Sequence, residues 1–395
     1  MSNLEKAEYI YVDHHSLVIE CVSEISKAPL LSVDLEFDKN RFRYGFNLCL
    51  IQIFDGSQTY LIDPLAKDID LSAIFKVFEN PQVPKVVFSF GEDLRLLHTL
   101  GCFPKGLYDL QIAAGLLNFP PSSLASLIEQ VLNFQISKNS QQSNWFQRPL
   151  TSDQLDYAVQ DVIYLPEIYQ LFNKDFDKKG TKNWIEQEMH HFESNNHEDA
   201  SQNDLLKEKY KADLNEIEWH IFTKLMHIRE THAKKINRPP FHVSERRTIT
   251  EIARNPQKIS DWMTIASNHR STKNSTFIQI LEAETEAAIE EAKQLGLSTR
   301  RRAAKRPSKE EYEKWKATEM KVKYAKQHFF KPVQKCIDQE YGEYVKTMIL
   351  NNRLIKDLVT GYHDNLLPYK ENVILECANK LNLDSSPYLN TKMES

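Results

Sequence analysis

The chain has 395 residues, of which 41% are hydrophobic and 27% are charged, and its formal net charge is −5. This composition is ordinary for soluble globular proteins and leaves room for two or three domains. The charge excludes a globally basic nucleic-acid binder but not a local basic patch. There are only ten glycines and no Walker or dinucleotide fingerprint, so no nicotinamide or flavin cofactor is expected.

The apolar segments and the cysteines indicate the cellular compartment in which the protein is located. No stretch reaches the apolar length that a membrane span needs, and the N-terminal residues do not resemble a secretory signal. The cysteines are odd in number and scattered, which argues against a disulfide framework and for a reducing compartment. We therefore expect a cytoplasmic protein without a membrane partner. The five cysteines are Cys21, Cys49, Cys102, Cys336 and Cys377.

The first 115 residues alternate between strand-like and helix-like runs. The strand-like runs are rich in Val, Ile, Leu and Phe, whereas the helix-like runs have apolar residues at helical spacing. Such alternation predicts an α/β unit with a mixed sheet. The expected strands are 30–37, 46–55, 59–64 and 84–90, and the expected helices are 71–80 and 92–101.

From about residue 120 the apolar spacing is helical throughout. One helix is expected at 122–132. Another is expected at 151–172, opened by a capping box of Thr151 and Gln154 and kinked or split at Pro166. Polar and charged runs then mark linkers. The predicted units are an N-terminal domain at 1–192, a linker at 193–208, helical domains at 209–295 and 312–385 around a basic linker at 296–311, and a tail at 386–395.

Two carboxylates interrupt the apolar strand at 30–37. Asp34 and Glu36 are two residues apart, so both side chains point to the same face of the strand. An ordinary surface strand is one explanation. The other is a divalent-cation site, because hard oxygen ligands suit Mg²⁺ or Mn²⁺ and a cation would compensate the repulsion.

Three more residues favour the cation site. Asp93 lies at a strand-to-helix junction, and Tyr157 and Asp161 are four apart on one helix face. Taken singly, Asp93 is explained as a residue favoured by the helix dipole, and the Tyr–Asp pair as part of an amphipathic helix. Together with Asp34 and Glu36, they supply the four acids of a two-metal site for phosphoryl transfer.

With these residues in place, the sequence resembles the ribonuclease D family of DEDD exonucleases. The motifs are "VDLEF" with Asp34 and Glu36, "GEDL" with Asp93, and "YAVQD" with Tyr157 and Asp161. A Tyr four residues before the last Asp is typical of the DEDDy branch. The segments "LCLIQIFDG", "YLIDPL" and "WFQRPLTSDQLDYAVQDVIYL" extend the resemblance. One departure is the stretch before Asp93, where the family often has H-A-G-x-E-D and this chain reads "FSFGED".

The resemblance implies a fold and a reaction. It implies a ribonuclease H-like α/β exonuclease domain, followed by all-α HRDC-type domains. Two divalent cations, Mg²⁺ or Mn²⁺, would be held by Asp34, Glu36, Asp93 and Asp161, with Tyr157 orienting the attacking water. The expected reaction is removal of nucleoside 5′-monophosphates from the 3′ end of RNA. Transfer-RNA precursors with 3′ trailers are the family's typical substrates.

Further residues are candidates for nucleic-acid contacts. Gln52 follows the first motif, and Lys138, Trp145 and Arg148 precede the third. A tryptophan can stack on a base and a cation can bind a phosphate, although Trp145 could equally anchor its loop on the domain. His98, just after the second motif, is expected to be a surface residue with no catalytic part.

The C-terminal half resembles known helical modules. The segment from "FTKLMHIRETHAKK" to "NPQKISDWM" resembles an HRDC domain, and the last block a second, degenerate one. HRDC modules are often implicated in nucleic-acid binding. The basic run between them could bind RNA phosphates or could simply be a solvated linker. Its members are Arg300, Arg301, Arg302, Lys305 and Arg306.

Other functions remain open on the sequence alone. The nuclear exosome exonuclease shares both modules but carries a large region before the first motif, whereas Asp34 comes early here. A DNA-directed 3′→5′ exonuclease is a second alternative. A nucleic-acid-binding scaffold without activity is a third, and the presence of all five motif residues argues against it.

Overall fold

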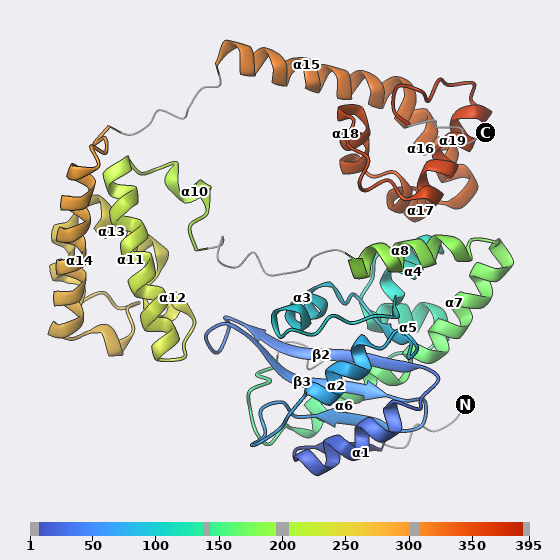
Figure 1. Cartoon of the computed structure of the whole chain (residues 1–395), viewed down its shortest axis with the longest axis horizontal. Helices are drawn as coiled ribbons and strands as arrows, with labels where there is room; N and C mark the ends of the chain where they lie inside the picture. Colours follow the sequence, from blue (N-terminus) through green and yellow to red (C-terminus); the bar gives the residue numbers. More distant parts are fainter. Residues whose placement is uncertain (1–7, 137–142, 195–204, 301–307, 390–395) are drawn as a thin grey trace.

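A six-stranded mixed sheet forms the first part of the chain (Figure 1). The structure is a computed structural model that describes residues 8–136, 143–194, 205–300 and 308–389. The strand order is β1-β4-β3-β2-β5-β6; β3 is antiparallel to both of its neighbours, and the other pairs are parallel. The strands are β1 (Tyr9–Val12), β2 (Leu31–Lys39), β3 (Phe46–Phe54), β4 (Thr59–Ile62), β5 (Lys85–Val87) and β6 (Leu107–Asp109).

Eight helices accompany this sheet within the described residues. They are α1 (His15–Ile25), α2 (Ser72–Glu79), α3 (Gly91–Thr99), α4 (Leu110–Leu116), α5 (Leu124–Leu132), α6 (Ser152–Ile163), α7 (Leu165–Lys179) and α8 (Lys182–Ser194). The capping box of Thr151 and Gln154 opens α6 as predicted. Pro166 lies in the first turn of α7, where its missing N–H is tolerated, so the predicted helix is split there rather than kinked.

The period-2 pattern of β2 explains which side chains face which layer. Leu31, Val33 and Leu35 are buried in a core that also includes apolar residues of α1, α2 and α3. The alternate residues, Asp34 and Glu36, therefore point to the opposite face of the sheet, against which α6 packs. The pairing with β3 shifts register just after Glu36, so the alternation changes only beyond the two acids.

The second block of helices has a core of its own. Its elements are α10 (Glu208–Lys211), α11 (Glu216–Lys235), α12 (Pro240–Val243), α13 (Arg246–Arg254), η1 (Pro256–Asp261), η2 (Arg270–Thr272) and α14 (Ser275–Gln294). Trp262 and Phe222 are fully buried at its centre. The side-chain oxygen of Asn237 accepts a hydrogen bond of 3.2 Å from the backbone N–H of Tyr44, in the β2–β3 hairpin.

The third block shares its core with the N-terminal unit. Its elements are α15 (Lys309–Ala325), the π-helical turn η3 (Lys326–Phe330), α16 (Lys331–Tyr341), α17 (Glu343–Ile349), α18 (Asn352–Thr360) and α19 (Pro368–Lys380). Ile349 and Phe330 belong to the same buried cluster as residues of α4, α5, α7 and α8. Gly342 has φ +101°, and a Cβ there would overlap the side chain of Asn118, whose oxygen accepts from the N–H of Tyr344.

The predicted fold class, a mixed α/β unit followed by helices, is confirmed. The predicted strands and helices did not include β1, α1, β6 or α4. The domain boundaries and the HRDC assignment stay predictions. The third block packs directly against the first, because residues of both belong to one buried core. Among the described residues, no helix combines the length and apolarity needed to cross a membrane. All five cysteines are buried free thiols.

Candidate metal centre and active site

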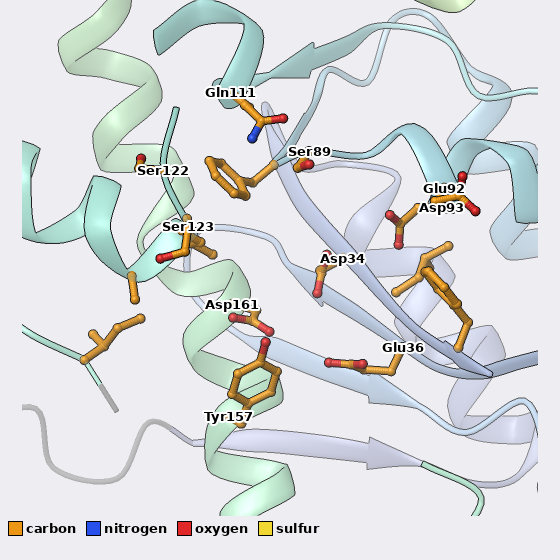
Figure 2. A pocket seen from close by; sticks show the side chains of 16 residues that line it. Asp34, Glu36, Ser89, Glu92, Asp93, Gln111, Ser122, Ser123, Tyr157 and Asp161 are labelled. Atoms are coloured by element: carbon orange, nitrogen blue, oxygen red, sulfur yellow. The ribbon is translucent and has the colours of Figure 1, made fainter. Parts of the chain in front are cut away.

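A cavity of about 490 Å³ lies beside the middle of β2, and all five motif residues line it (Figure 2). Asp34 and Glu36 come from β2, Tyr157 and Asp161 from α6, and Asp93 from the first turn of α3. The five residues span about a third of the chain and meet because β2, α3 and α6 converge at this cavity. The structure therefore brings the whole predicted set together.

Three of the carboxylates form a compact cluster. One oxygen each from Asp34, Glu36 and Asp161 lies within 4.8 Å of the other two. Glu36 and Asp161 are buried and Asp34 is partly buried. Among the described residues, Asp161 Oδ2 has no hydrogen-bond partner although it is shielded from solvent. An orphaned buried oxygen beside two further carboxylates is the donor set that a hard divalent cation requires.

The electrostatics of the cluster agree with this chemistry. Burial raises the pKa of Asp34 well above its ordinary value, and repulsion from Asp161 and Asp93 raises it further. Burial and the charge of Asp34 likewise raise the pKa of Glu36. Burial raises the pKa of Asp161 to about 7. The cluster therefore needs positive charge at neutral pH, which bound protons or a divalent cation can supply.

Asp93 lies on the other side of the cavity from Tyr157 (Figure 2). It is buried in the first turn of α3. Loss of hydration raises the pKa of Asp93 to about 8, and repulsion from Asp109 and Glu92 adds to the effect. Asp93 is not part of the 4.8 Å cluster. Its position fits a second cation bound next to the first.

Tyr157 lies one helical turn before Asp161 and points at the cluster (Figure 2). Its hydroxyl donates a hydrogen bond to the Asp161 carboxylate. Burial and the neighbouring carboxylates raise the pKa of Tyr157, so its hydroxyl stays protonated at neutral pH. The ring centroids of Tyr157 and Trp145 are 6.1 Å apart, and this packing helps to hold the phenol in place.

Three residues that were predicted to contact a nucleotide, Gln52, Trp145 and Arg148, lie away from the cavity. Gln52 is fully buried in β3 opposite Asp34, and Trp145 is only 3% exposed, so neither side chain reaches the surface where a nucleotide would bind. Arg148 Nε and Nη2 donate to the two oxygens of Asp63 at 2.5 and 2.7 Å, and Nη2 also donates to the Cys49 carbonyl. None of these three lines the cavity. Their positions indicate packing rather than contact with a nucleotide.

The remaining predicted contacts lie mostly outside the described residues. Lys138, Arg301 and Arg302 fall in that category, as do Lys305 and Arg306, whereas Arg300 is exposed. The expectation for His98 was wrong. The side chain of His98 is 8% exposed, and its ring packs against that of Phe103 at a centroid distance of 4.8 Å, because α3 buries this face.

Several residues that line the cavity were not predicted. Phe88 and Ser89 come just before the second motif, where the departure from H-A-G-x-E-D was the available signal. Gln111, Ser122 and Ser123 also line the cavity, on the side away from Glu36 (Figure 2). Local sequence carries no signal for these three, because only the fold brings α4 and the start of α5 to the β2 acids.

The family model described as 3'-5' exonuclease matches residues 9–177, a range that includes the mixed sheet and its cluster of carboxylates. Ribonuclease D of Pseudomonas paraeruginosa is 30% identical over 280 residues, which cover 70% of this chain and 73% of that protein. Ribonuclease D of Bartonella henselae is 30% identical over 235 residues. The chain belongs to the ribonuclease D family.

The extent of these similarities differs. The match to the Bartonella protein covers 59% of this chain and 57% of that protein. The match to the ribonuclease D of Zymomonas mobilis covers 63% of this chain and 64% of that protein. The chain therefore spans less than two thirds of the length of these two relatives. The crystal structure of Escherichia coli RNase D superimposes with a TM-score of 0.67 at 21% identity, covering 95% of this chain and 98% of that one. The catalytic core of RRP6 from Trypanosoma brucei gives 0.63 at 21% identity, covering 74% and 82%. These structures share the fold.

Proposed function

We propose that this protein is a 3′→5′ exoribonuclease that releases nucleoside 5′-monophosphates by two-metal-ion hydrolysis. One observation carries the proposal: three carboxylates and an aligned tyrosine hydroxyl meet on the floor of a single open cavity. The volume of about 490 Å³ lies in the range of small-ligand sites and can admit a terminal nucleotide.

Each acid has a part in the proposal. Asp34, Glu36 and Asp161 would hold one divalent cation, and Asp34 and Asp93 a second. Bound Mg²⁺ or Mn²⁺ would polarise the attacking water and neutralise the charge that develops on the phosphate. Asp161 accepts the hydrogen bond that orients Tyr157, and the Tyr157 oxygen would accept a hydrogen bond from the attacking water. The water oxygen would bond to phosphorus and release one proton to solvent, while the bond between phosphorus and the 3′ oxygen of the chain breaks and that oxygen takes up a proton from solvent.

The other cavity residues would position the terminal nucleotide. Phe88 and Ile136 supply apolar surface for the base, while Gln111, Ser122 and Ser123 offer hydrogen-bonding groups to sugar and phosphate. These apolar and polar groups together would orient the nucleotide with its phosphate towards the acids. The proposal includes a cytoplasmic location and transfer-RNA precursors with 3′ trailers as substrates, as the family resemblance implies. A DNA-directed exonuclease and an inactive nucleic-acid-binding scaffold are the alternatives.

The test uses end-labelled RNA with an unpaired 3′ extension and single-stranded DNA of the same sequence. Each is incubated with the full chain in Mg²⁺, in Mn²⁺ or in EDTA, and the products are resolved as a ladder and by chromatography. We expect stepwise shortening of the RNA and nucleoside 5′-monophosphates, both abolished by EDTA and by Asp34→Asn. Asp156→Asn, on α6 but outside the cavity lining, is the matched control and should stay active. Preferential degradation of DNA, or binding without release, would favour one of the alternatives.

A further inference from the structure

Asp109 is a buried carboxylate that lies outside the cavity. It is the last residue of β6, is 2% exposed and does not line the cavity. A buried carboxylate requires partners that replace its hydration. Those partners are backbone N–H groups of two different segments, one at the start of α4 and one just before α3. Asp109 therefore joins two segments whose side chains line the cavity.

Three hydrogen bonds are divided between the two oxygens of Asp109. Oδ1 accepts from the backbone N–H of Ser89 at 3.1 Å and from that of Gln111 at 2.8 Å. Oδ2 accepts from the N–H of Phe90 at 2.9 Å. The bond from Gln111 is an ordinary N-cap of α4. The other two bonds hold the residues that precede α3, so capping of α4 does not explain them.

Ser89 adopts a backbone conformation that needs such support. Its φ is +56°, in the left-handed region that is disfavoured for residues with a Cβ. Among the described residues, every other non-glycine residue with positive φ is an asparagine or an aspartate, whose short side chain can support that conformation locally. For Ser89, the hydrogen bonds from its own N–H and from that of Phe90 to Asp109 supply the support. They fix the point at which the chain leaves β5 and enters α3.

The start of α3 determines where Asp93 lies. Phe90 is the N-cap residue of α3, and its carbonyl accepts a hydrogen bond of 2.9 Å from the backbone N–H that follows Asp93. Asp93 is therefore carried by the first turn of a helix whose start is tied to Asp109. Gln111 is carried by the first turn of α4, and both side chains line the cavity (Figure 2). One buried carboxylate thus holds the backbone on two sides of the same cavity.

We propose that Asp109 is a positioning residue for the second divalent cation. It sets the position of Asp93 relative to Asp34 and touches neither cation nor nucleotide itself. Two-cation hydrolysis requires ions ~3.5–4 Å apart, and a displacement of about 1 Å can cost on the order of 100-fold in rate. Residues that hold metal ligands in place contribute about 10- to 100-fold to metal affinity or activity. The inference rests on the proposed function, because it adds a positioning residue to the same cation site.

Asp109→Asn separates the two roles of this side chain. An asparagine has one oxygen acceptor, and its amide nitrogen is a donor. The oxygen can keep the bonds from Ser89 and Gln111, since both reach the same oxygen of Asp109, and asparagine is a good N-cap. The amide then faces the N–H of Phe90, so the bond at the start of α3 is lost. Asp109→Ser, which also keeps one capping oxygen and lacks the second, is the alternative variant in case the first does not fold.

Asp38→Asn is the matched control. Asp38 is 4% exposed, and its two oxygens accept three backbone N–H groups of the β2–β3 turn in the same two-to-one division. Asp38 does not line the cavity. The control therefore removes one buried carboxylate and one backbone hydrogen bond, as Asp109→Asn does, without altering the start of α3.

The first measurement is made without metal. Hydrogen exchange of the full chain in EDTA is followed by mass spectrometry for the wild type, Asp109→Asn and Asp38→Asn. Exchange at the start of α3 should be about 2- to 10-fold faster in Asp109→Asn, the net effect of one lost hydrogen bond, and exchange of α4 should be unchanged. The control should match the wild type in both helices. If Asp109 acted through its charge alone, exchange at α3 would not change, and the inference would be overturned.

The second measurement counts bound cations. Mn²⁺ is titrated into each full-length protein with a nucleoside 5′-monophosphate present, and free Mn²⁺ is followed by electron paramagnetic resonance. The wild type and Asp38→Asn should bind two ions. In Asp109→Asn, one ion should bind as in the wild type and the other about 10- to 100-fold more weakly. Nucleotide release by Asp109→Asn should fall by a similar factor at low Mn²⁺ and recover at high Mn²⁺, whereas Asp93→Asn, which removes the ligand itself, should not recover.

The outcomes are distinguishable. If the wild type releases nucleotides and Asp109→Asn binds both Mn²⁺ ions as tightly as it does, the inference is wrong and the proposed function stands. If Asp109→Asn loses one of two ions but the wild type releases no nucleotide, the proposed function is wrong while the positioning role remains. Equal weakening of both ions in Asp109→Asn, or a wild type that binds fewer than two, would also overturn the inference.

Discussion

Replacing Asp161 by asparagine should make the metal-free protein more stable at neutral pH, and increasingly so as the pH rises. Burial raises the pKa of Asp161 from 3.8 to about 7, so the folded state binds a proton more tightly than the unfolded state does. The stability contributed by this proton is complete below about pH 4 and is lost as pH rises through 7. The asparagine side chain of the variant carries no titrating proton and no charge.

The size of the effect follows from the same numbers. Each pH unit between the folded and unfolded pKa values is worth about 1.36 kcal/mol, so the wild type should lose roughly 2–3 kcal/mol at this site between pH 5 and pH 7. Burial raises the pKa values of Asp34 and Glu36 as well, so the stability that these two sites contribute also falls as the pH rises. The variant removes one of the charges that repel Asp34 and Glu36. Its free energy of unfolding should therefore depend even less on pH.

The assay is urea denaturation in EDTA at pH 5, 6, 7 and 8 for the wild type, Asp161→Asn and the control Asp156→Asn. The free energy of unfolding of Asp161→Asn relative to the wild type should rise steadily across this range, whereas the control should run parallel to the wild type. Adding Mn²⁺ at pH 8 should stabilise the wild type, by about 2.7 kcal/mol at a hundredfold excess over Kd, and the variant less. Parallel curves for all three proteins would refute the reasoning.

Three further predictions concern other residues. Tyr157→Phe should lower the rate of nucleotide release by roughly 10²–10⁴-fold in single-turnover assays, while the affinity for RNA in EDTA is retained. A drop in rate of less than threefold would mean that Tyr157 serves only in packing. Arg148→Ala leaves the buried Asp63 unpaired and should cost about 3–5 kcal/mol in urea denaturation; weaker RNA binding at unchanged stability would restore its predicted nucleotide contact. Ile349→Ala should cost about 2–5 kcal/mol and destabilise the N-terminal unit too, because both share one core; an early, separate melting transition of the third block would contradict that shared core.

The site was predictable because its signals are local. Two acids at strand spacing, an acid at a strand-to-helix junction, and a tyrosine one helical turn before an acid each follow from backbone periodicity. The order of these motifs then supplied the family resemblance. The structure adds the three-dimensional proximity, which places three of the carboxylates within 4.8 Å of each other.

The features that were missed depend on contacts between distant residues. Arg148 looked like a phosphate ligand, and only the fold reveals Asp63, 85 residues earlier, as its partner. Gln52 follows the first motif, yet its place in a central strand buries it completely. The packing of the third block on the N-terminal unit likewise depends on Asn118 and Gly342, which nothing in the local pattern connects.

The most direct test of the central claim is a crystal structure of the full chain soaked in Mn²⁺ and a nucleoside 5′-monophosphate, measured at the manganese absorption edge. We predict an anomalous peak between the carboxylates of Asp34, Glu36 and Asp161, with the phosphate of the nucleotide beside it. A second peak is expected near Asp93. No anomalous density at these carboxylates, or a nucleotide bound elsewhere with the cavity empty, would contradict the account.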